Sequence, residues 1–239
     1  MPQSSKILLE QFSSKFKIAS FEIVQGVFSG ATDHLDHILY KPTHRIDSDA
    51  YPLLPDVLAI ARRIMHENEG IGIAANQLGL GLQFFIIEAQ KQQNNNRYSL
   101  DSSVEYQAFV NPRIVSASKS FSNFWHGCLS AKGQPRGRLS TYTWIEYEAQ
   151  DTYAKTITGR LDGLAAIIFQ HEFRHLLGGL YLNYCAKLLS TDQLSEAIKS
   201  GLEQNLNNNV PIEHISNLLA DYDVGDSIDA YLSKRHKCY

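Results

Sequence analysis

The segment LDGLAAIIFQHEFRHLLGG, residues 161–179, constrains the fold more than any other part of the chain. Its long apolar middle, with Asp162 as N-cap and Gly178 and Gly179 as a stop signal, predicts a single helix. A helix that is apolar on nearly all sides has to be buried. It also carries two histidines, a glutamate and an arginine, and burying such groups is unfavourable unless something pairs with them. The rest of the chain is therefore expected to form a shell around this helix.

The spacing of the two histidines indicates a bound metal ion. His171 and His175 are four residues apart, which places both imidazoles on one helix face, one turn apart. Glu172 is offset by one residue, so it lies beside the cation, where it can take a proton from a metal-bound water. The alternative is a solvated helix with two unrelated histidines, and the apolar residues 165–169 argue against it.

The third ligand is open at this point. A metzincin peptidase would need a histidine where this chain has Tyr181, whereas a gluzincin would use a later glutamate, for which Glu196 has a suitable separation. The other candidate is Cys128 in WHGCLS, residues 125–130. A thiolate with two imidazoles and a water makes a tetrahedral catalytic site, and it favours Fe(II), Co(II), Ni(II) or Zn(II). A free cysteine is more often a small buried apolar residue, so Cys128 alone is a weak signal.

The remaining pattern predicts an α+β fold. A helix is expected over residues 51–69, where apolar side chains recur at helical spacing, and a further helical and polar stretch begins at about Thr191. Strands are expected at residues 83–89, 108–110, 141–151 and 155–161, the second of them stopped by Asn111-Pro112. The polar residues 91–103 are expected to form a surface loop.

Size and charge exclude several classes of protein. The chain has 239 residues, enough for one sizeable domain with or without an appendage. A net charge of -3 argues against a dedicated nucleic-acid binder, which would be basic. No apolar run is long enough to span a bilayer, and the N-terminus lacks the apolar core of a signal peptide, so a cytoplasmic location is expected. The three cysteines do not suggest a disulfide framework.

A further block, GIGIAANQLG at residues 70–79, supplies a candidate for transition-state stabilisation. Its glycines allow a substrate backbone to approach closely, and the Gln77 amide can donate to a developing oxyanion. Alone, this block is typical of a glycine turn leading into a buried strand. Together with GCLS and QHExxHL, in this order and at these separations, it forms a pattern specific enough to identify a protein family.

These three blocks resemble those of the peptide deformylases. The first has the family form Gly-φ-Gly-φ-Ala-Ala-x-Gln, and residues 70–77 match it fully. The second, Glu-Gly-Cys-Leu-Ser, differs here only at His126, and the third, Gln-His-Glu-x-Asp-His-Leu, differs only at Arg174. The resemblance predicts an N-terminal arm (1–37), a catalytic domain (38–184) and a helical C-terminal extension (185–239).

The resemblance implies antiparallel strands around a central helix that carries HExxH. It implies one divalent metal ion, most commonly Fe(II), with Zn, Ni and Co as alternatives, held by Cys128, His171 and His175. Water at the fourth position attacks the formyl group of an N-formylmethionyl peptide, while Glu172 accepts the proton and later delivers it to the leaving amine. The remaining implied site residues are Gln77 and the backbone N–H of Leu129 for the oxyanion, Gly72 and Gly127 for the peptide backbone, and Ile71, Leu164, Ile167 and Ile168 for the methionine side chain.

The two departures from the motifs leave alternatives open. The family glutamate that His126 replaces usually pairs with a downstream arginine, for which Arg136 or Arg138 is the nearest candidate. Arg174 reverses the charge of the family aspartate beside a metal ligand. A divergent metallo-amidase with another N-blocked substrate therefore stays an alternative, as does a catalytically impaired relative whose tail binds a partner such as the ribosome. Neither a specific nucleic acid nor a membrane is expected as a partner.

Overall fold

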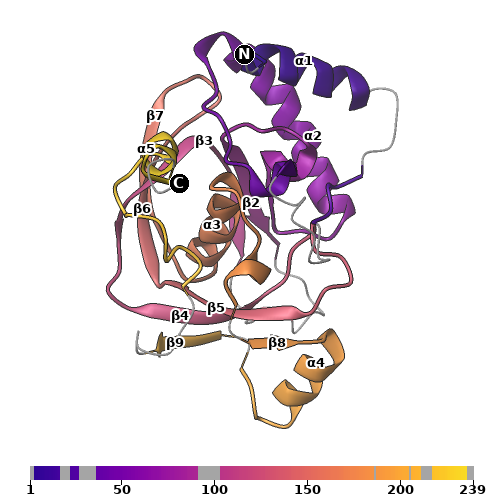
Figure 1. The fold of residues 1–239 in the computed structure, drawn as a ribbon, viewed down its shortest axis with the longest axis vertical. Coiled ribbons are helices and arrows are strands. Elements are labelled where there is room, and N and C mark those ends of the chain that lie inside the picture. Colours follow the sequence, from indigo (N-terminus) through magenta and orange to yellow (C-terminus); the bar gives the residue numbers. More distant parts are fainter. Residues whose placement is uncertain are drawn as a thin grey trace.

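The computed structural model describes residues 3–16, 22–26, 36–90, 103–185, 187–204, 206–210 and 217–235. Its central element is helix α3 (Gly163–Leu176), which carries the HExxH residues and lies between the strands (Figure 1). Helices α1 (Ser5–Phe16) and α2 (Leu54–Glu67) pack together on one side of the molecule. None of the helices in these ranges is long and apolar enough to cross a membrane.

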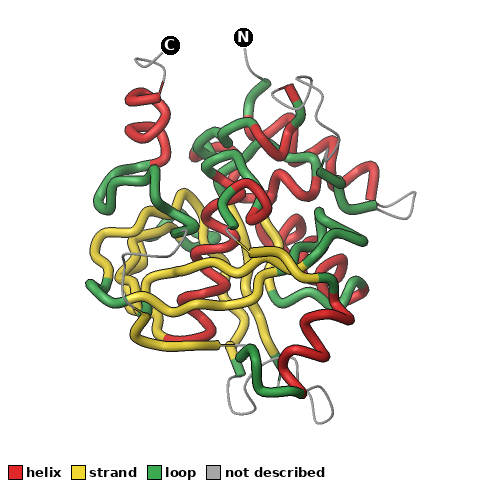
Figure 2. The backbone as a smooth tube through the Cα atoms, turned by 60° about the horizontal axis from the view of Figure 1, so that its bottom comes forward, coloured by secondary structure: helices red, strands yellow, loops and turns green. Residues whose placement is uncertain are grey.

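Two antiparallel sheets surround α3. The five-stranded sheet has the order β1 (Gly72–Ala74), β2 (Phe84–Ala89), β3 (Val104–Ala117), β6 (Trp144–Gln150) and β7 (Thr156–Asp162). The four-stranded sheet has the order β8 (Lys187–Leu189), β5 (Arg136–Tyr142), β4 (Phe121–His126) and β9 (Leu206–Val210). The predicted α+β fold with antiparallel strands around a buried helix is confirmed, and Figure 2 shows the strands wrapping the helix.

Aromatic side chains join α3 to the larger sheet. Phe169 packs edge-on against Phe85 and Phe109, with ring centroids 4.9 Å apart in both pairs. Tyr147 packs edge-on against Phe109 at 4.9 Å, so strands β2, β3 and β6 and the helix share one ring cluster. Edge-to-face pairs of this kind stabilise a core by about 0.5–1.5 kcal/mol each beyond the burial of their surface. This packing fixes the helix that carries the two histidines.

The predicted strand over residues 108–110 is longer than expected. β3 continues through Asn111 and Pro112 to Ala117, with a register shift between Val110 and Arg113 in its pairing with β6. Proline lacks an N–H, but at an irregular step in the pairing no ladder bond is required of it. Asn111 adopts φ 50°, and its side-chain oxygen accepts a bond from the Ile46 N–H at 2.8 Å. Side-chain bonding thus stabilises a bulge where the sequence indicated a stop.

The predicted strand over residues 141–151 is two elements. β5 ends at Tyr142 and β6 begins at Trp144, and the two strands belong to different sheets. The Thr143 N–H between them donates to the Ser118 hydroxyl at 2.9 Å, which holds the corner. The alternation of side chains continues through this corner, so it gave no signal of the change of sheet. The strand predicted over residues 155–161 is present as β7.

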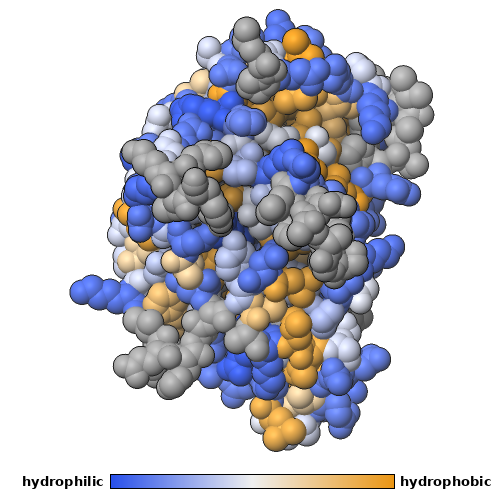
Figure 3. Space-filling model, viewed as in Figure 1, coloured by the Kyte–Doolittle hydropathy of each residue, from blue (hydrophilic) through white to orange (hydrophobic). Residues whose placement is uncertain are grey.

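The C-terminal extension is not wholly helical. It contains α4 (Thr191–Lys199) and α5 (Ile228–Arg235), but also β8 and β9, which add to the two edges of the β4–β5 pair. These strands are short and lack the alternation of side chains by which a strand is recognised from sequence. Figure 3 shows apolar side chains gathered on the surface near β8 and α4, where Leu188 and Leu202 are exposed. The division of the chain at residues 37 and 184 stays a prediction.

Candidate metal centre

The three predicted ligands converge. One donor atom each from Cys128, His171 and His175 lie within 4.8 Å of one another. Cys128 Sγ lies 3.2 Å from His175 Nε2. The histidines come from α3, whereas the cysteine comes from the turn that follows β4. Glu196 is exposed on α4 and does not belong to this group, so the gluzincin alternative is wrong.

The chemistry of the group fits a divalent metal ion. One sulfur and two imidazole nitrogens match the donors that zinc, iron(II), cobalt(II) and nickel(II) accept. Burial raises the pKa of the Cys128 thiol far above its usual range, and the neighbouring Glu172 carboxylate raises it further. A thiolate here therefore requires a positive charge beside it. Glu172 Oε2 is buried without a hydrogen-bond partner among the described residues, as expected of an oxygen that interacts with a bound metal ion, water or substrate.

The imidazoles are held in the form that binds metals. Burial lowers the pKa of His171 to about 4 and lowers the pKa of His175 well below its usual range. Both rings are consequently neutral at neutral pH, as metal ligation requires. Burial also raises the pKa of Glu172 well above its usual range. A cation nearby would lower that pKa again, so Glu172 would be ionised, and able to accept a proton, with a metal ion bound.

The metal-free protein is expected to lose stability as the pH falls below about 6.5, the usual histidine pKa. The folded-state pKa values of His126, His171 and His175 are all depressed. Their stabilising contribution is thus present above the unfolded pKa and lost as the pH falls towards the folded pKa, at about 1.4 kcal/mol per group and pH unit. The raised pKa of Glu172 makes the folded state more stable as the pH falls, but this single group is outweighed by the three histidines. Urea unfolding of metal-free protein between pH 5 and 8 would measure this slope, and a flat profile would contradict the expectation.

The amide of Gln77 is oriented towards the cysteine. Gln77 lies in a 3-10 turn (Ala75–Leu78) that directly follows β1. Its Oε1 accepts a bond from the Ala74 N–H at 2.8 Å, so its Nε2 points the other way. That nitrogen lies 3.4 Å from Cys128 Sγ and donates to the Ser130 hydroxyl at 3.2 Å. The structure therefore brings together the Gln77 donor and the Cys128 turn that also contains Leu129.

The glycines of the first block lie against this centre. A Cβ at Gly72 would meet Glu172 Oε1 at 2.5 Å, and a Cβ at Gly70 would meet Leu129 Cδ1 at 2.7 Å. In the cysteine block, a Cβ at Gly127 would meet the Arg136 guanidinium at 1.7 Å, closer still. β1, which contains Gly72, is the edge strand of the five-stranded sheet as described. Glycine is needed at these positions because a side chain would displace the groups that form the site.

The residues predicted to receive the methionine side chain lie in or beside the apolar core around α3. Leu164 and Ile168 are buried in one apolar cluster, and Ile71 packs against it. Ile167 is also buried, 3% exposed, on the same helix. Leu164, Ile168 and His171 follow one another at helical spacing, so an apolar stripe leads to the first histidine. Their role as a side-chain pocket stays a prediction.

His126 contacts a predicted ligand, which the sequence reasoning missed. Its ring stacks on that of His171, with centroids 5.3 Å apart and an interplanar angle of 6°. The two Nδ1 atoms are 3.1 Å apart, so one of them donates to the other and His171 Nε2 is left for a metal ion. The arginine pair that the family glutamate usually makes has no counterpart at His126 among the described ion pairs. Arg138 instead pairs with Glu203 at 3.1 Å.

A second missed contact fixes the cysteine turn from the N-terminal arm. Gln25 Nε2 donates to the Leu129 carbonyl at 3.0 Å, and Gln25 Oε1 accepts from the Lys132 N–H at 3.1 Å. The Gly26 N–H donates to the Ser130 carbonyl at 2.8 Å. Nothing in the sequence around Gln25 distinguishes it from other polar residues, so only the fold identifies this contact.

Comparison with known proteins agrees with this geometry. The family model described as polypeptide deformylase matches residues 31–190. Peptide deformylase 1 of Nitrosomonas europaea is 32% identical over 162 residues, covering 66% of this chain and 90% of the relative. Peptide deformylase 2 of Nostoc sp. is 33% identical over 145 residues, covering 61% of this chain and 76% of the relative.

Solved structures have the same fold. A class I type b peptide deformylase from Acinetobacter baumannii, with Met-Ala-Ser bound, superposes with a TM-score of 0.60 at 22% identity, covering 69% of this chain and 98% of that one. A probable peptide deformylase from Synechococcus phage S-SSM7 superposes with a TM-score of 0.56 at 26% identity, covering 69% and 99%. Since the family match spans all three sequence blocks and the helix that carries both histidines, the chain belongs to the peptide deformylase family, metal-dependent hydrolases that remove the N-terminal formyl group from nascent peptides.

Proposed function

We propose that this chain removes the formyl group from N-formylmethionyl peptides, with its metal ion held by Cys128, His171 and His175. The observation that carries the proposal is the convergence of five chemical groups at one buried place: the thiol, both imidazoles, the Glu172 carboxyl group and the Gln77 amide. The soft donor set supports Fe(II) as the native metal, with Zn(II), Ni(II) or Co(II) as functional substitutes.

Glu172 is proposed as the proton carrier. A divalent metal ion bound by the three ligands would polarise the formyl oxygen and lower the pKa of a water molecule. Glu172 is 4% exposed, and its Oε2 has no partner among the described residues, so this oxygen is available to accept a proton from the attacking water. The same carboxyl group then delivers the proton to the leaving amine.

Gln77 and Leu129 are proposed to hold the oxyanion. The Ala74 N–H fixes the carbonyl end of the Gln77 side chain, so that the donor end faces Cys128. The backbone N–H of Leu129 follows the cysteine directly in the chain. Two donors aimed at one position before the substrate binds require no rearrangement in the transition state.

The peptide is proposed to lie along the edge of the larger sheet. β1 pairs with β2 on one side only, so an extended peptide has an edge at Gly72 to which it can add as a strand. Gly127 is proposed to bind the peptide backbone on the opposite side. Ile71, Leu164, Ile167 and Ile168 are proposed to receive the methionine side chain, since all four belong to or pack beside the apolar core around α3.

Gly72→Ala is expected to lower kcat/KM for formyl-Met-Ala-Ser by about tenfold to a hundredfold, because an ångström-scale displacement of a catalytic group has effects of this size. The new Cβ would lie 2.5 Å from Glu172 Oε1, so the carboxyl group has to move. Gly81→Ala is the matched control, since nothing lies within 4 Å of a Cβ there. Equal rates for the two variants would contradict the placement of Glu172.

The proposal is tested by formate release from formyl-Met-Ala-Ser, using protein purified anaerobically and loaded with Fe(II) or Ni(II), with the metal content measured. Acetyl-Met-Ala-Ser is the competing substrate. Formate release that greatly exceeds acetate release supports the proposal. If metal-loaded protein favours the acetyl group, the alternative of a divergent metallo-amidase holds, and His126 and Arg174 are the first residues to revert. A cytoplasmic location and contact with the ribosome stay predictions.

A further inference from the structure

Residues 217–235, here called the C-terminal clasp, pack against α3 and run from Ser140 of β5 to helix α5 (Figure 1). Backbone bonds attach the clasp to both sheets: the Leu218 N–H donates to the Ser140 carbonyl at 3.0 Å, and the Gly225 N–H donates to the Ile114 carbonyl at 2.8 Å. The Gln83 side chain donates to Asp229 on α5 at 3.1 Å. The clasp is therefore an integral part of the fold.

The clasp also completes the core around α3. Four of its side chains are buried in the same apolar cluster as the helix: Leu219, Tyr222, Ile228 and Tyr231. Tyr222 packs edge-on against Phe173 of α3, with centroids 5.0 Å apart. Phe173 follows Glu172 directly, so the clasp packs against the segment of helix that lies between the two histidines.

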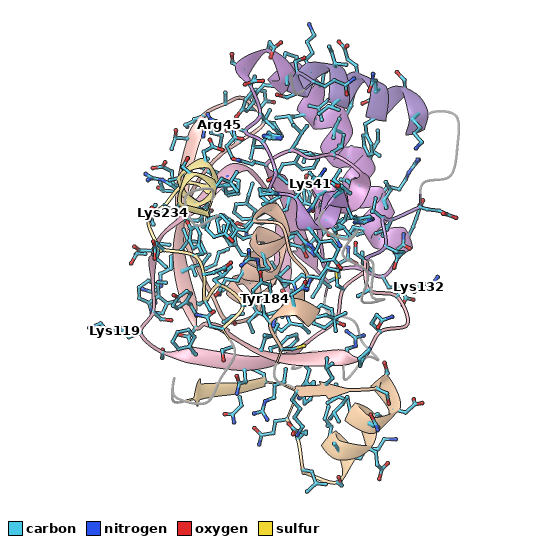
Figure 4. The ribbon with its side chains drawn as sticks, in the orientation of Figure 1. Lys41, Arg45, Lys119, Lys132, Tyr184 and Lys234 are labelled. Carbon is cyan, nitrogen blue, oxygen red and sulfur yellow. The ribbon has the colours of Figure 1, made fainter. Side chains whose placement is uncertain are left out.

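A closed polar triad joins the clasp to Arg174. This arginine is only 1% exposed, and its Nη1 donates to Asp221 Oδ1 at 2.5 Å. Its Nη2 donates to the Tyr231 hydroxyl at 3.1 Å, and that hydroxyl donates to Asp221 Oδ2 at 2.7 Å. The Tyr184 ring covers the guanidinium at 4.7 Å, and Figure 4 labels this tyrosine beside the end of α3. Asp221 and Tyr231 of the clasp thus bind Arg174 and also bind each other.

The charge of Arg174 explains why the triad is needed. A buried guanidinium without a carboxylate is strongly unfavourable, because its charge loses hydration and gains no compensating partner. Arg174 stands where the family motif has an aspartate, so the charge at this position is reversed, and Asp221 supplies the missing negative charge from the extension. Arg174 directly precedes His175, whose carbonyl accepts a bond from Asn76 Nδ2 at 2.7 Å. The last turn of α3 is therefore held from two sides.

The other departure from the family motifs has a parallel solution. His126 stands in place of a glutamate that would pair with an arginine, and Arg138 pairs with Glu203 instead, again a residue of the extension. Glu203 also binds Lys187, the residue that covers the Trp125 ring. Each departure from the motifs thus occurs together with an acidic residue beyond position 185 that pairs with an arginine: Asp221 with Arg174, and Glu203 with Arg138.

We propose that the C-terminal clasp positions the metal site, with Asp221 and Tyr231 acting through Arg174 to hold the last turn of α3 and with it His175. This inference rests on the proposed role of His175 as a ligand. Asp221 and Tyr231 are positioning residues, since neither contacts the three predicted ligands directly. Losing either of them is therefore expected to change the position of His175, while the three metal ligands stay the same.

The test uses the full chain and Co(II) alone as the probe. Asp221→Asn keeps the shape of the side chain and removes its charge; Co(II) affinity is expected to fall about tenfold, the lower end of the effect of outer partners on metal sites. The visible spectrum of bound Co(II) is expected to change, and kcat to fall with KM little changed. The double variant Arg174→Asp with Asp221→Arg, which swaps the charges, is expected to recover part of the affinity.

Two further variants make the test decisive. Asp223→Asn is the matched control, since Asp223 is an exposed acid of the clasp paired with Lys234, and it should leave every readout unchanged. If Asp221→Asn does not fold, Tyr231→Phe removes a single hydroxyl and should show the same changes more weakly. A variant that lowers the melting temperature but leaves Co(II) affinity, spectrum and kcat intact overturns the proposal. The Co(II) measurements need no substrate, so failure of deformylation itself would be seen separately.

Discussion

Glu172→Gln is expected to lower kcat/KM for formyl-Met-Ala-Ser by about 10²–10⁴-fold, the usual contribution of a general base. The substitution keeps the shape of the side chain against Gly72, where the carboxyl group fits closely, and removes only its ability to carry a proton. The metal content should stay unchanged, because Glu172 is not among the three predicted ligands. Formate release and metal analysis on the same preparations measure both quantities, and near wild-type activity would exclude Glu172 as the proton carrier.

The same substitution is expected to stabilise the metal-free protein at neutral pH. Burial raises the pKa of Glu172, so its carboxyl group contributes to stability below its unfolded pKa and loses that contribution as the pH rises through the folded pKa. The glutamine side chain does not titrate, so the variant loses no stability in this way as the pH rises. Urea unfolding of both metal-free proteins should show a more stable variant at pH 7.5 and a smaller difference at pH 4. A wild-type protein that is the more stable at pH 7.5 would mean that another group pairs with the carboxylate.

The centre of the site is predictable because its residues are local. His171, Glu172 and His175 share one helix, and the helix itself is signalled by an apolar run between Asp162 and a glycine stop. The cysteine turn and the glycine block are each short and contiguous, so their internal geometry follows from few residues. What joins the three blocks is the resemblance, because spacing alone left Glu196 open as a third ligand.

The surroundings of the site are not predictable in this way. Arg174 and Asp221 are 47 residues apart in sequence, and the stretch around Asp221 has no periodic pattern that would place it against α3. The stacking of His126 on His171 likewise depends on the end of β4 lying beside α3 in the assembled fold. The same limit applies to the corner at Thr143, since a strand that leaves one sheet for another keeps its alternation of side chains. Contacts between distant segments depend on the assembled fold.

The protonation of Cys128 leads to the second large effect. Because burial raises the pKa of this thiol, the metal-free protein holds it protonated, and metal binding has to release that proton. Metal titration in weakly buffered solution with a pH indicator should therefore detect proton release at neutral pH. The neutral histidines have no proton to give up there, so the release comes from the thiol and from the Glu172 carboxyl group, whose pKa burial also raises.

Cys128→Ala is expected to weaken metal binding by about 10²-fold or more, since an apparent binding free energy of about 10–16 kcal/mol shared by four ligands amounts to about 3 kcal/mol for each. The thiol's share of the proton release should disappear with it, and so should the thiolate-to-metal absorption of the Co(II) form. Cys185→Ala is the matched control, because Cys185 is the other described free cysteine and is not in the metal-binding group. If Cys128→Ala kept wild-type affinity and proton release, the third ligand would have to be another residue, and the assignment of the whole centre would fail. Loss of affinity and of the thiol's share of the proton release in Cys128→Ala, with both retained in Cys185→Ala, would identify the thiolate as the ligand that completes the two histidines of α3.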